Sequence, residues 1–598
     1  MKKKVIVGIS LIAAVTLIWL GACNSSNSNK TTESVGQNTP YSSIKLPQDA
    51  MATCTVSKDT FNTWFKSGAA TENGAVTPPN SVTFGHQNNC DFYQWSERMF
   101  LWITSSSQEY AGTVMASPVF YNVVSDPAGG LMLEKHTPGI IPPATSSVEK
   151  NGPNRLPVFR DKKGRLFEVM VHKAGEKVLV KNKAGKLLEL SNVEKAANGP
   201  VLLKDKTGNK IEQPSIVTKL VHPENVLHAF PTSNGTVILD INGNEVDAGI
   251  DQATSNALIA QNNSLVYYIT MVNDMYAYYL TAINDPNFKN DSISSKQFPT
   301  TAPERTCLVN YAKSHGYLVP TDSNALAMEL KTSWVIADSL ANPEDYFLMD
   351  AMIPTYDASS NTFWKPVGQQ KAKLALVGIH IVGSVAGHPE MIWATFEHQS
   401  NTPNAAYQYI NSKGQVQTVA ADAGSWLFNS NAAGGSYNVP YINVDSASNL
   451  IATTGNTIAS SNTQRLFPFG TAIGTVPNQQ DTSASASNTE LISINNSIMS
   501  MIPGKDLRKN YLFIGAVWTF GGAAPTGSIY PVDSTSGGAI GTSVLANSTM
   551  ETYFQSTSFT CFTCHSNNSL QPGALSHVFS KIKPLNKMLK KIDQDQKK

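Results

Sequence analysis

The chain has 598 residues, of which 41% are hydrophobic and 15% are charged, and its formal net charge is +1. A chain of this length and composition can bury one or more apolar cores. The balanced charge gives no basic surface of the kind that nucleic-acid binding needs, so no nucleic-acid partner is expected.

The N-terminus has the pattern of an export signal. Three lysines, Lys2 to Lys4, precede an apolar run from Val5 to Leu20 that is short for a membrane-spanning helix. The run leads into Leu-Gly-Ala-Cys at 20–23, which resembles the lipobox of bacterial lipoproteins. Residues 1–22 are therefore expected to be a cleaved signal peptide and Cys23 a lipidated N-terminus. An uncleaved anchor is the alternative, and both deliver the chain across the inner membrane.

The residues after Cys23 predict a tether and a location. Residue 24 is Asn and not Asp, which in proteins that resemble Gram-negative lipoproteins favours the outer membrane. We expect the protein to be held by its lipid at the periplasmic face of that membrane. Residues 23–45 are rich in Ser, Asn and Thr, and such a polar segment predicts a flexible tether.

Residues 46–545 are predicted to form a large α+β body that is rich in β-structure and has a few amphipathic helices. Aromatic residues at helical spacing in DTFNTWFKSG (59–68) and CDFYQWSERMFLWITSS (90–106) predict two amphipathic helices. Between 155 and 250, four glycines follow Asp or Asn in polar turns, which predicts a meander of β-hairpins. These glycines are Gly164, Gly185, Gly208 and Gly243.

The second half of the body mixes one predicted helix with several predicted strands. Apolar residues at helical spacing predict a long helix over 251–284; they are Leu258, Leu265, Ile269, Val272 and Tyr276. Runs with a β-pattern predict strands at 325–338, 371–384, 390–401 and 511–522. The Ser-, Asn-, Thr- and Ala-rich segment from about 399 to 500 predicts long loops and short strands.

Six cysteines are present, and three of them remain once Cys23 and the two cysteines of the motif below are set aside. Cys54, Cys90 and Cys307 allow three single disulfides in an oxidising compartment. Pairing of Cys54 with Cys90 is the most local choice, and it would contribute roughly 3 to 4 kcal/mol in the chain-entropy model. Cys307 would then be a buried thiol.

Residues 561–565 read Cys-Phe-Thr-Cys-His, the C-x-x-C-H pattern of covalent c-type haem attachment. The two thiols can add across the haem vinyl groups, and the histidine can reach the iron from the same side. A zinc half-site and a redox dithiol share the C-x-x-C spacing, but zinc needs further ligands and a thioredoxin-like motif needs a βαβ frame. We expect one covalent haem c on Cys561 and Cys564, with His565 as the proximal iron ligand.

The motif, with LANSTMETY before it and LSHVF after it, resembles the C-terminus of large, poorly characterised bacterial lipoproteins of the cytochrome c family. The stretches MELKTSW, GIHIV and EMIWATFEHQSN are similar to other parts of the same proteins. The resemblance implies a haem protein and supplies no substrate.

The predicted haem-binding segment covers 546–598, and only 33 residues follow His565. Such a short tail cannot enclose a haem, so the body is expected to cover it. For the sixth iron position we favour His577, because it is local and neutral imidazole is a good iron ligand. The alternatives are Met550, Met588, His380, His388 and His398. A turn near residue 386 would place His380 opposite Ile392 and His398 about 20 Å further along, so these two histidines could not serve one metal.

Three functions fit these observations. The favoured one is an exported monohaem cytochrome that carries single electrons, with the membrane as a partner through its lipid and a redox protein as a candidate partner. The second is a haem oxidoreductase of the peroxidase or oxygenase type with an open iron position. The third is a ligand-binding outer-membrane lipoprotein with a structural haem. Whether the protein is an enzyme is left open.

Overall fold

In the computed structural model, all described residues belong to the unit Pro40–Lys598. The predicted signal peptide, Cys23 and most of the tether lie outside the described residues. The described residues are 40–107, 112–126, 129–136, 142–145, 158–160, 166–172, 176–195, 201–218, 223, 226–232, 235–246, 256–319, 322–429, 437–444, 448–453, 456–470, 484–527, 537–555, 560–565 and 568–585.

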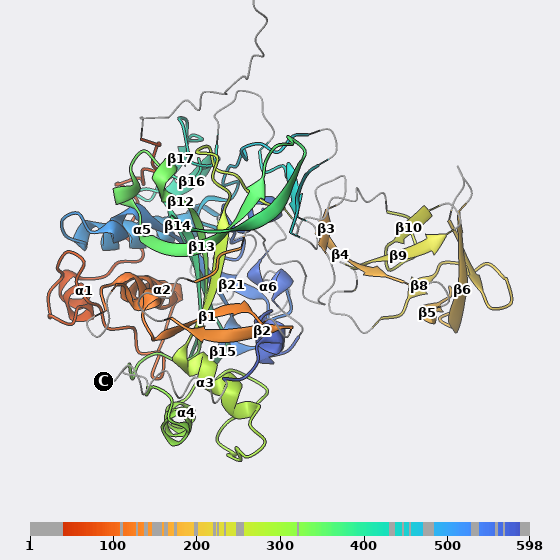
Figure 1. The fold of residues 1–598 in the computed structure, drawn as a ribbon, viewed down its shortest axis with the longest axis horizontal. Helices are drawn as coiled ribbons and strands as arrows, with labels where there is room; N and C mark the ends of the chain where they lie inside the picture. The colour runs from red at the N-terminus through yellow and green to blue at the C-terminus, as the bar shows by residue number, and fades with distance from the viewer. Residues whose placement is uncertain are drawn as a thin grey trace, which may run out of the picture. The chain divides into compact units, whose positions relative to one another are not determined.

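The protein is α+β with a large β-sheet body, as the sequence predicts (Figure 1). The main sheet has eleven antiparallel strands, and eight of them follow one path. In spatial order these are β2 (Leu131–Lys135), β1 (Phe120–Ser125), β11 (Tyr267–Asn273), β12 (Met328–Ile336), β14 (Phe363–Val385), β15 (His388–His398), β20 (Tyr511–Thr519) and β21 (Ala539–Gly541). The strands off this path are β13 (Leu348–Asp357), β18 (Ile442–Val444) and β19 (Leu450–Ala452). The four predicted strand runs correspond to β12, β14, β15 and β20, which confirms them.

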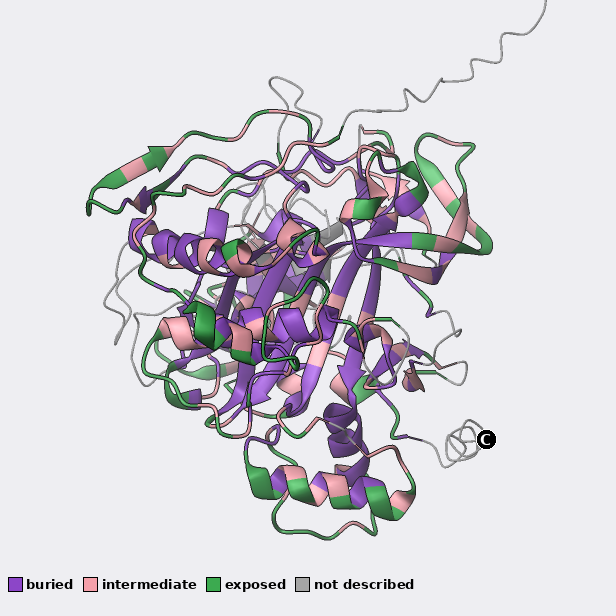
Figure 2. Ribbon diagram, turned by 90° about the vertical axis from the view of Figure 1, so that its left-hand side faces the viewer, coloured by how far each residue is buried: buried purple, intermediate pink, exposed green. Residues whose placement is uncertain are grey.

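The helices of the described residues are α1 (Lys58–Trp64), α2 (Asn89–Thr104), α3 (Asp274–Ile283), α4 (Ala302–His315), α5 (Ala484–Met501), α6 (Cys561–Cys564) and α7 (Pro572–Leu575). The two amphipathic helices predicted at the start of the body are α1 and α2. They pack with α5 on one face of the sheet, where the Phe100 ring stacks on Phe396 and the Phe92 ring stacks on Trp518. Figure 2 shows the central strands under these helices as mostly buried.

The hairpin-rich region forms two small sheets. One contains β10 (Gly235–Leu239), β9 (Val226–Thr232), β4 (Leu166–Val171) and β3 (Val158–Arg160); the other contains β7 (Val201–Asp205), β6 (Leu187–Lys195), β5 (Val178–Lys181) and β8 (Ser215–Ile216). A separate hairpin pairs β16 (Tyr407–Ile410) with β17 (Val416–Val419). Gly185, Gly208 and Gly243 have φ of 72° to 80°, as the predicted turns require. The predicted turn at Gly164 lies outside the described residues.

The predicted long helix over 251–284 is wrong for residues 256–273. Residues 256–266 form a connection with a turn at 261–263, across which Ile259 pairs with Leu265, and Tyr267–Asn273 is the strand β11, which pairs with β1 and β12. Its Tyr, Ile, Thr and Val side chains favour strands, and pairing on both edges overrides a helical spacing that the sequence shows by coincidence. Only α3 is helical, and it begins where the Asn273 side chain accepts a hydrogen bond from Tyr276 N.

The prediction of loops and short strands between 399 and 500 missed α5. Its Ser, Asn and Thr residues have low helix propensity. Tertiary hydrogen bonds compensate for this: Ser493 Oγ bonds to both backbone groups of Cys54, and the Asn495 side chain bonds to both backbone groups of Phe513. Because these partners are distant in sequence, local patterns do not reveal the helix.

The predicted register of the β14–β15 hairpin is also wrong, although the turn falls at Ala386 and Gly387 as expected. His380 pairs with Thr395 and not with Ile392. A register shift between Gly383 and Val385 moves the pairing, since a bulge adds unpaired residues to one strand. The residues of β15 that lie opposite β14 therefore differ from the predicted ones.

The second face of the sheet carries two apolar clusters. One contains Val382 and Trp393 of the sheet together with α3 and Phe562 of α6. The other contains Tyr268 and Val377 together with Met550. Between the two clusters runs a row of polar residues, one from each of four adjacent strands, which pair directly across β11, β12, β14 and β15. This polar row consists of Thr270, Lys331, His380 and Thr395.

Candidate haem site

The motif cysteines lie on the single turn of α6. The His565 backbone N–H donates to Cys561 O at 3.0 Å, and the Thr560 N–H donates to the Thr563 hydroxyl at 3.0 Å. Residues three apart on a helical turn are neighbours, so Cys561 and Cys564 lie on one side of α6. Neither sulfur takes part in a disulfide. The turn therefore presents two thiols side by side, with the histidine directly after them.

The His565 ring is held by the backbone of α7. Its Nδ1 donates a hydrogen bond to Leu575 O at 2.7 Å, since a carbonyl oxygen can only accept. This bond fixes the tautomer in which Nε2 carries the lone pair. Metal-binding histidines usually have their other ring nitrogen held by a carbonyl or carboxylate in this way, so the donor set fits a haem iron.

Trp393 of the central sheet packs against the motif. The Phe562 ring is fully buried and meets the Trp393 ring edge-on, with centroids 5.9 Å apart. The Trp393 and His565 rings also touch, with centroids 4.5 Å apart. Trp393 lies on β15, so a residue of the central sheet contacts both Phe562 and the predicted iron ligand His565.

The residues after the motif are fixed to the body as well. Ser576 Oγ donates to Glu329 Oε2 of β12 at 2.6 Å and lies 2.8 Å from the Tyr276 hydroxyl of α3. Lys583 forms an ion pair with Asp126 at 2.6 Å. The described part of the predicted haem-binding segment is thus packed on the body and belongs to the same compact unit.

The stretch LANSTMETY before the motif lies on the same sheet face. Asn547 Nδ2 donates to Thr395 Oγ1 at 2.9 Å, and the Thr549 and Ser333 hydroxyls are 2.6 Å apart. Gly378 permits this approach, because a Cβ atom there would come within 2.6 Å of Thr549 Oγ1. Glu551, at the end of the turn, accepts a hydrogen bond from His380 Nε2 at 3.0 Å.

The electrostatics of the site differ from those of a redox dithiol. Burial raises the pKa of the Cys561 thiol well above its ordinary value, and the nearby Glu551 carboxylate and Cys564 raise it further. Reactive cysteines have a lowered pKa in an electropositive environment, which is the opposite situation. Burial opposes ionisation of Glu551, but His380 and Lys331 outweigh it and keep the pKa of that carboxyl below its ordinary value.

His577 lies beside His565 and not across from it. The two rings stack with centroids 4.0 Å apart and planes 13° apart, and His577 Nε2 donates to Cys564 O at 3.0 Å. Two imidazoles that bind one iron from opposite sides need centroids about 6 Å apart, given a metal–nitrogen distance of about 2 Å. The described position of His577 is therefore that of a neighbour to the proximal ring, and its role as sixth ligand remains an untested prediction.

The other candidates for the sixth position have different surroundings. Met550 is buried in the apolar cluster of Tyr268, and Met588 lies outside the described residues. His388 is buried and donates through Nδ1 to Glu390 at 2.8 Å. His398 stacks on Tyr346 at 3.8 Å, and burial lowers its pKa to about 3. Only His380, among the body histidines considered, is linked to the residues around the motif.

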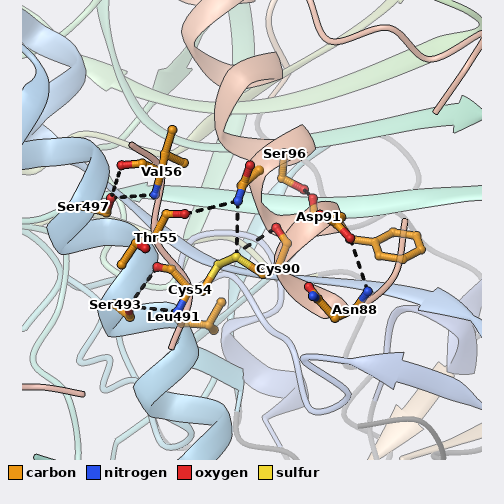
Figure 3. Close-up of a disulfide and its surroundings, with 12 residues drawn as sticks. Cys54, Thr55, Val56, Asn88, Cys90, Asp91, Ser96, Leu491, Ser493 and Ser497 are labelled. Atoms are coloured by element: carbon orange, nitrogen blue, oxygen red, sulfur yellow. Dashed lines mark hydrogen bonds between the residues drawn. A yellow bond between two sulfur atoms is a disulfide. The ribbon is translucent and has the colours of Figure 1, made fainter. Parts of the chain in front are cut away.

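The remaining cysteines have defined positions. Cys54 and Cys90 form a disulfide, the pairing that the sequence favours, and Figure 3 shows it beside the first turn of α2 and beside α5. Ser493 and Ser497 of α5 bond to the backbone of Cys54 and Val56. Cys307, on α4, is partly exposed, whereas the sequence suggested a buried thiol.

The residues that sequence reasoning missed are Trp393, Lys331, Glu551 and the Leu575 carbonyl. The quoted stretches EMIWATFEHQSN, MELKTSW, LANSTMETY and LSHVF contain them, but the sequence gives no sign that Trp393 contacts the motif or that Glu551 and Lys331 lie beside His380.

Within the described ranges, no group of three or more His, Cys, Asp or Glu side chains is arranged to hold a metal ion. No helix in the same part of the chain is long and apolar enough to cross a membrane. Comparison of the chain with models of protein families, with curated proteins and with solved structures finds no match. The resemblance to cytochrome c lipoproteins stays a prediction.

Proposed function

We propose that the protein is an exported monohaem c-type cytochrome that carries single electrons. The observation that supports this most is the folded C-x-x-C-H turn, in which His565 Nδ1 is held by Leu575 O. A zinc half-site or a redox dithiol does not require an oriented histidine directly after the second cysteine.

Each residue of the site has a role in this proposal. When bound, a c-type haem supplies one-electron chemistry, with an iron that alternates between the ferric and ferrous states. Cys561 and Cys564 hold the group covalently, and His565 binds the iron through Nε2. Trp393 and Phe562 would shield the sheet-facing side of the haem from water. Solvent access is one of the factors that set the reduction potential of a haem.

The N-terminal sequence supports a location for this activity. Lipid on Cys23 would hold the protein at the periplasmic face of the outer membrane, where c-type haem can be attached and disulfides persist. This function requires redox proteins of the periplasm as partners. One partner must donate an electron to the ferric haem, and a second partner must accept an electron from the ferrous haem.

Haem staining of a denaturing gel tests the proposal. The protein is expressed with and without a cytochrome c maturation system, together with a Cys561→Ala, Cys564→Ala double variant. We expect a haem band for the wild type only when the maturation system is present, and none for the double variant. The matched control is Cys307→Ala, which removes a thiol outside the site and should keep the band. A haem band that persists in the double variant would contradict the proposal.

A further inference from the structure

We propose that His380 supplies the sixth iron ligand, from the central sheet, opposite His565. This inference rests on the proposed function, because it requires a haem on Cys561 and Cys564. It assigns the sixth position to the body of the protein and not to the residues that follow the motif.

His380 lies close to Trp393 on the sheet. His380 and Val382 lie on the same face of β14, and Val382 pairs directly with Trp393. His380 is therefore the diagonal neighbour of Trp393, and such neighbours lie roughly 7 to 8 Å apart, with their Cβ atoms somewhat closer. The Trp393 ring contacts His565, so the motif histidine and His380 lie over the same face of the sheet, each with Trp393 as a neighbour.

Two residues of the polar row, His380 and Lys331, are accessible to solvent. His380 and Lys331 are partly exposed although they lie on central strands, where the next residues along each strand are buried. The side chain of His380 is 17% exposed. Apolar clusters cover the sheet on both sides of this row. Thr395, in the same row, is fully buried under Asn547, so the face is less closely covered at Lys331 and His380 than at Thr395.

A hydrogen bond to Glu551 orients the His380 ring. His380 Nε2 donates to Glu551 Oε1 at 3.0 Å, and within the described chain its Nδ1 has no hydrogen-bond partner. A carboxylate that holds one ring nitrogen and leaves the other for a metal is the usual support of a histidine ligand. His565 is held in the equivalent way by Leu575 O.

Glu551 also connects His380 to the turn that precedes the motif. Its Oε2 accepts from Asn547 N at 2.9 Å, while its Oε1 accepts from His380. Gly378, on the same face of β14 as His380, lets this turn approach the sheet, because a Cβ atom there would lie 2.6 Å from Thr549 Oγ1. The LANSTMETY turn thus holds a carboxylate against one ring nitrogen of His380.

The experiment compares visible and electron paramagnetic resonance spectra of matured holoprotein for the wild type, His380→Ala, His577→Ala and His315→Ala. We expect a six-coordinate low-spin wild type that does not bind carbon monoxide. In His380→Ala the spectrum should become high-spin and carbon monoxide should bind, and added imidazole should restore the low-spin form. His577→Ala tests the rival ligand and should remain low-spin. The matched control is His315→Ala, on α4 and paired with Asp285, which should keep the wild-type spectrum.

A second variant guards against simple misfolding of His380→Ala. His380→Met replaces the proposed ligand with a thioether, so it should stay six-coordinate and show a higher midpoint potential, as His/Met ligation does. An unchanged low-spin spectrum in His380→Ala, or a wild type that already binds carbon monoxide, would overturn the inference. In both cases haem staining of the same samples would still show covalent haem, which separates this failure from failure of the proposed function.

Discussion

Glu397 links the central sheet to the turn that precedes the motif. Its Oε1 accepts from Ser548 N at 2.8 Å, and its Oε2 accepts from Arg465 Nη2 at 2.7 Å. Both charged side chains are almost fully buried. A buried ion pair of this kind adds little over an apolar pair, but the loss of one partner leaves an uncompensated charge.

We predict that Glu397→Ala lowers the free energy of unfolding by about 3 to 5 kcal/mol, because Arg465 would stay buried without its counter-charge. Denaturant unfolding of the purified protein measures this. Asp350→Ala is the control: Asp350 pairs with Lys371 at 2.7 Å on the surface, so its loss should cost less than about 1 kcal/mol. Equal effects of the two substitutions would contradict the argument.

Elements whose signal is local could be predicted from the sequence. The hairpin turns are an example: the side chains of Asn182, Asp205 and Asp240 each accept hydrogen bonds from the backbone two and four residues later, and a glycine lies between. Elements set by distant partners could not be predicted. The strand β11 and the helix α5 owe their conformation to β1, β12, Cys54 and Phe513, which lie far away in the chain.

Gly378 lies where β14 contacts the turn before the motif. In Gly378→Ala the new Cβ would lie 2.6 Å from Thr549 Oγ1 and 2.7 Å from Ser333 Oγ, so the turn or the strand must move. We expect a loss of stability of about 1 to 3 kcal/mol, typical of overpacking in a core.

The control for this substitution lies on the same strand. In Gly368→Ala the nearest atom, Thr355 Oγ1, would lie 3.4 Å from the new Cβ, so the change should be tolerated. Thermal unfolding of both variants gives the comparison. If Gly378→Ala were as stable as Gly368→Ala, the turn would not be packed on the sheet as described.

The candidate site is assembled from segments that are distant in the chain. The sequence identifies Cys561, Cys564 and His565, because their spacing is contiguous. It does not identify Trp393 as the neighbour of His565, since the register of the β14–β15 hairpin and the packing of α6 on the sheet decide that contact. Proximity in sequence favoured His577, whereas the structure links His380 of the sheet to Glu551 in the turn before the motif.

Stability of the molecule should also depend on pH through a buried carboxyl in α2. Burial raises the pKa of Glu97 to about 8. The folded state therefore binds a proton that the unfolded state has released, and stability falls as the pH rises from about 4.5 to about 8. Each unit of pKa difference is worth about 1.4 kcal/mol, so the loss should reach several kcal/mol.

Glu97→Gln should remove this dependence and be more stable than the wild type above pH 8. Asp274, whose pKa burial raises to about 7, remains in both proteins, so the difference between them reports Glu97 alone. Urea unfolding at several pH values measures it. Parallel pH profiles for the two proteins would show that the carboxyl is not buried in its neutral form.

The most direct test of the account is peptide mass mapping of matured protein isolated from cell envelopes. We expect the peptide with Cys561 and Cys564 to carry one haem, bound through both sulfurs. The same map should show the Cys54–Cys90 disulfide and an unmodified Cys307. A motif peptide found as two thiols, or as a Cys561–Cys564 disulfide, would contradict the claim that this turn attaches a haem.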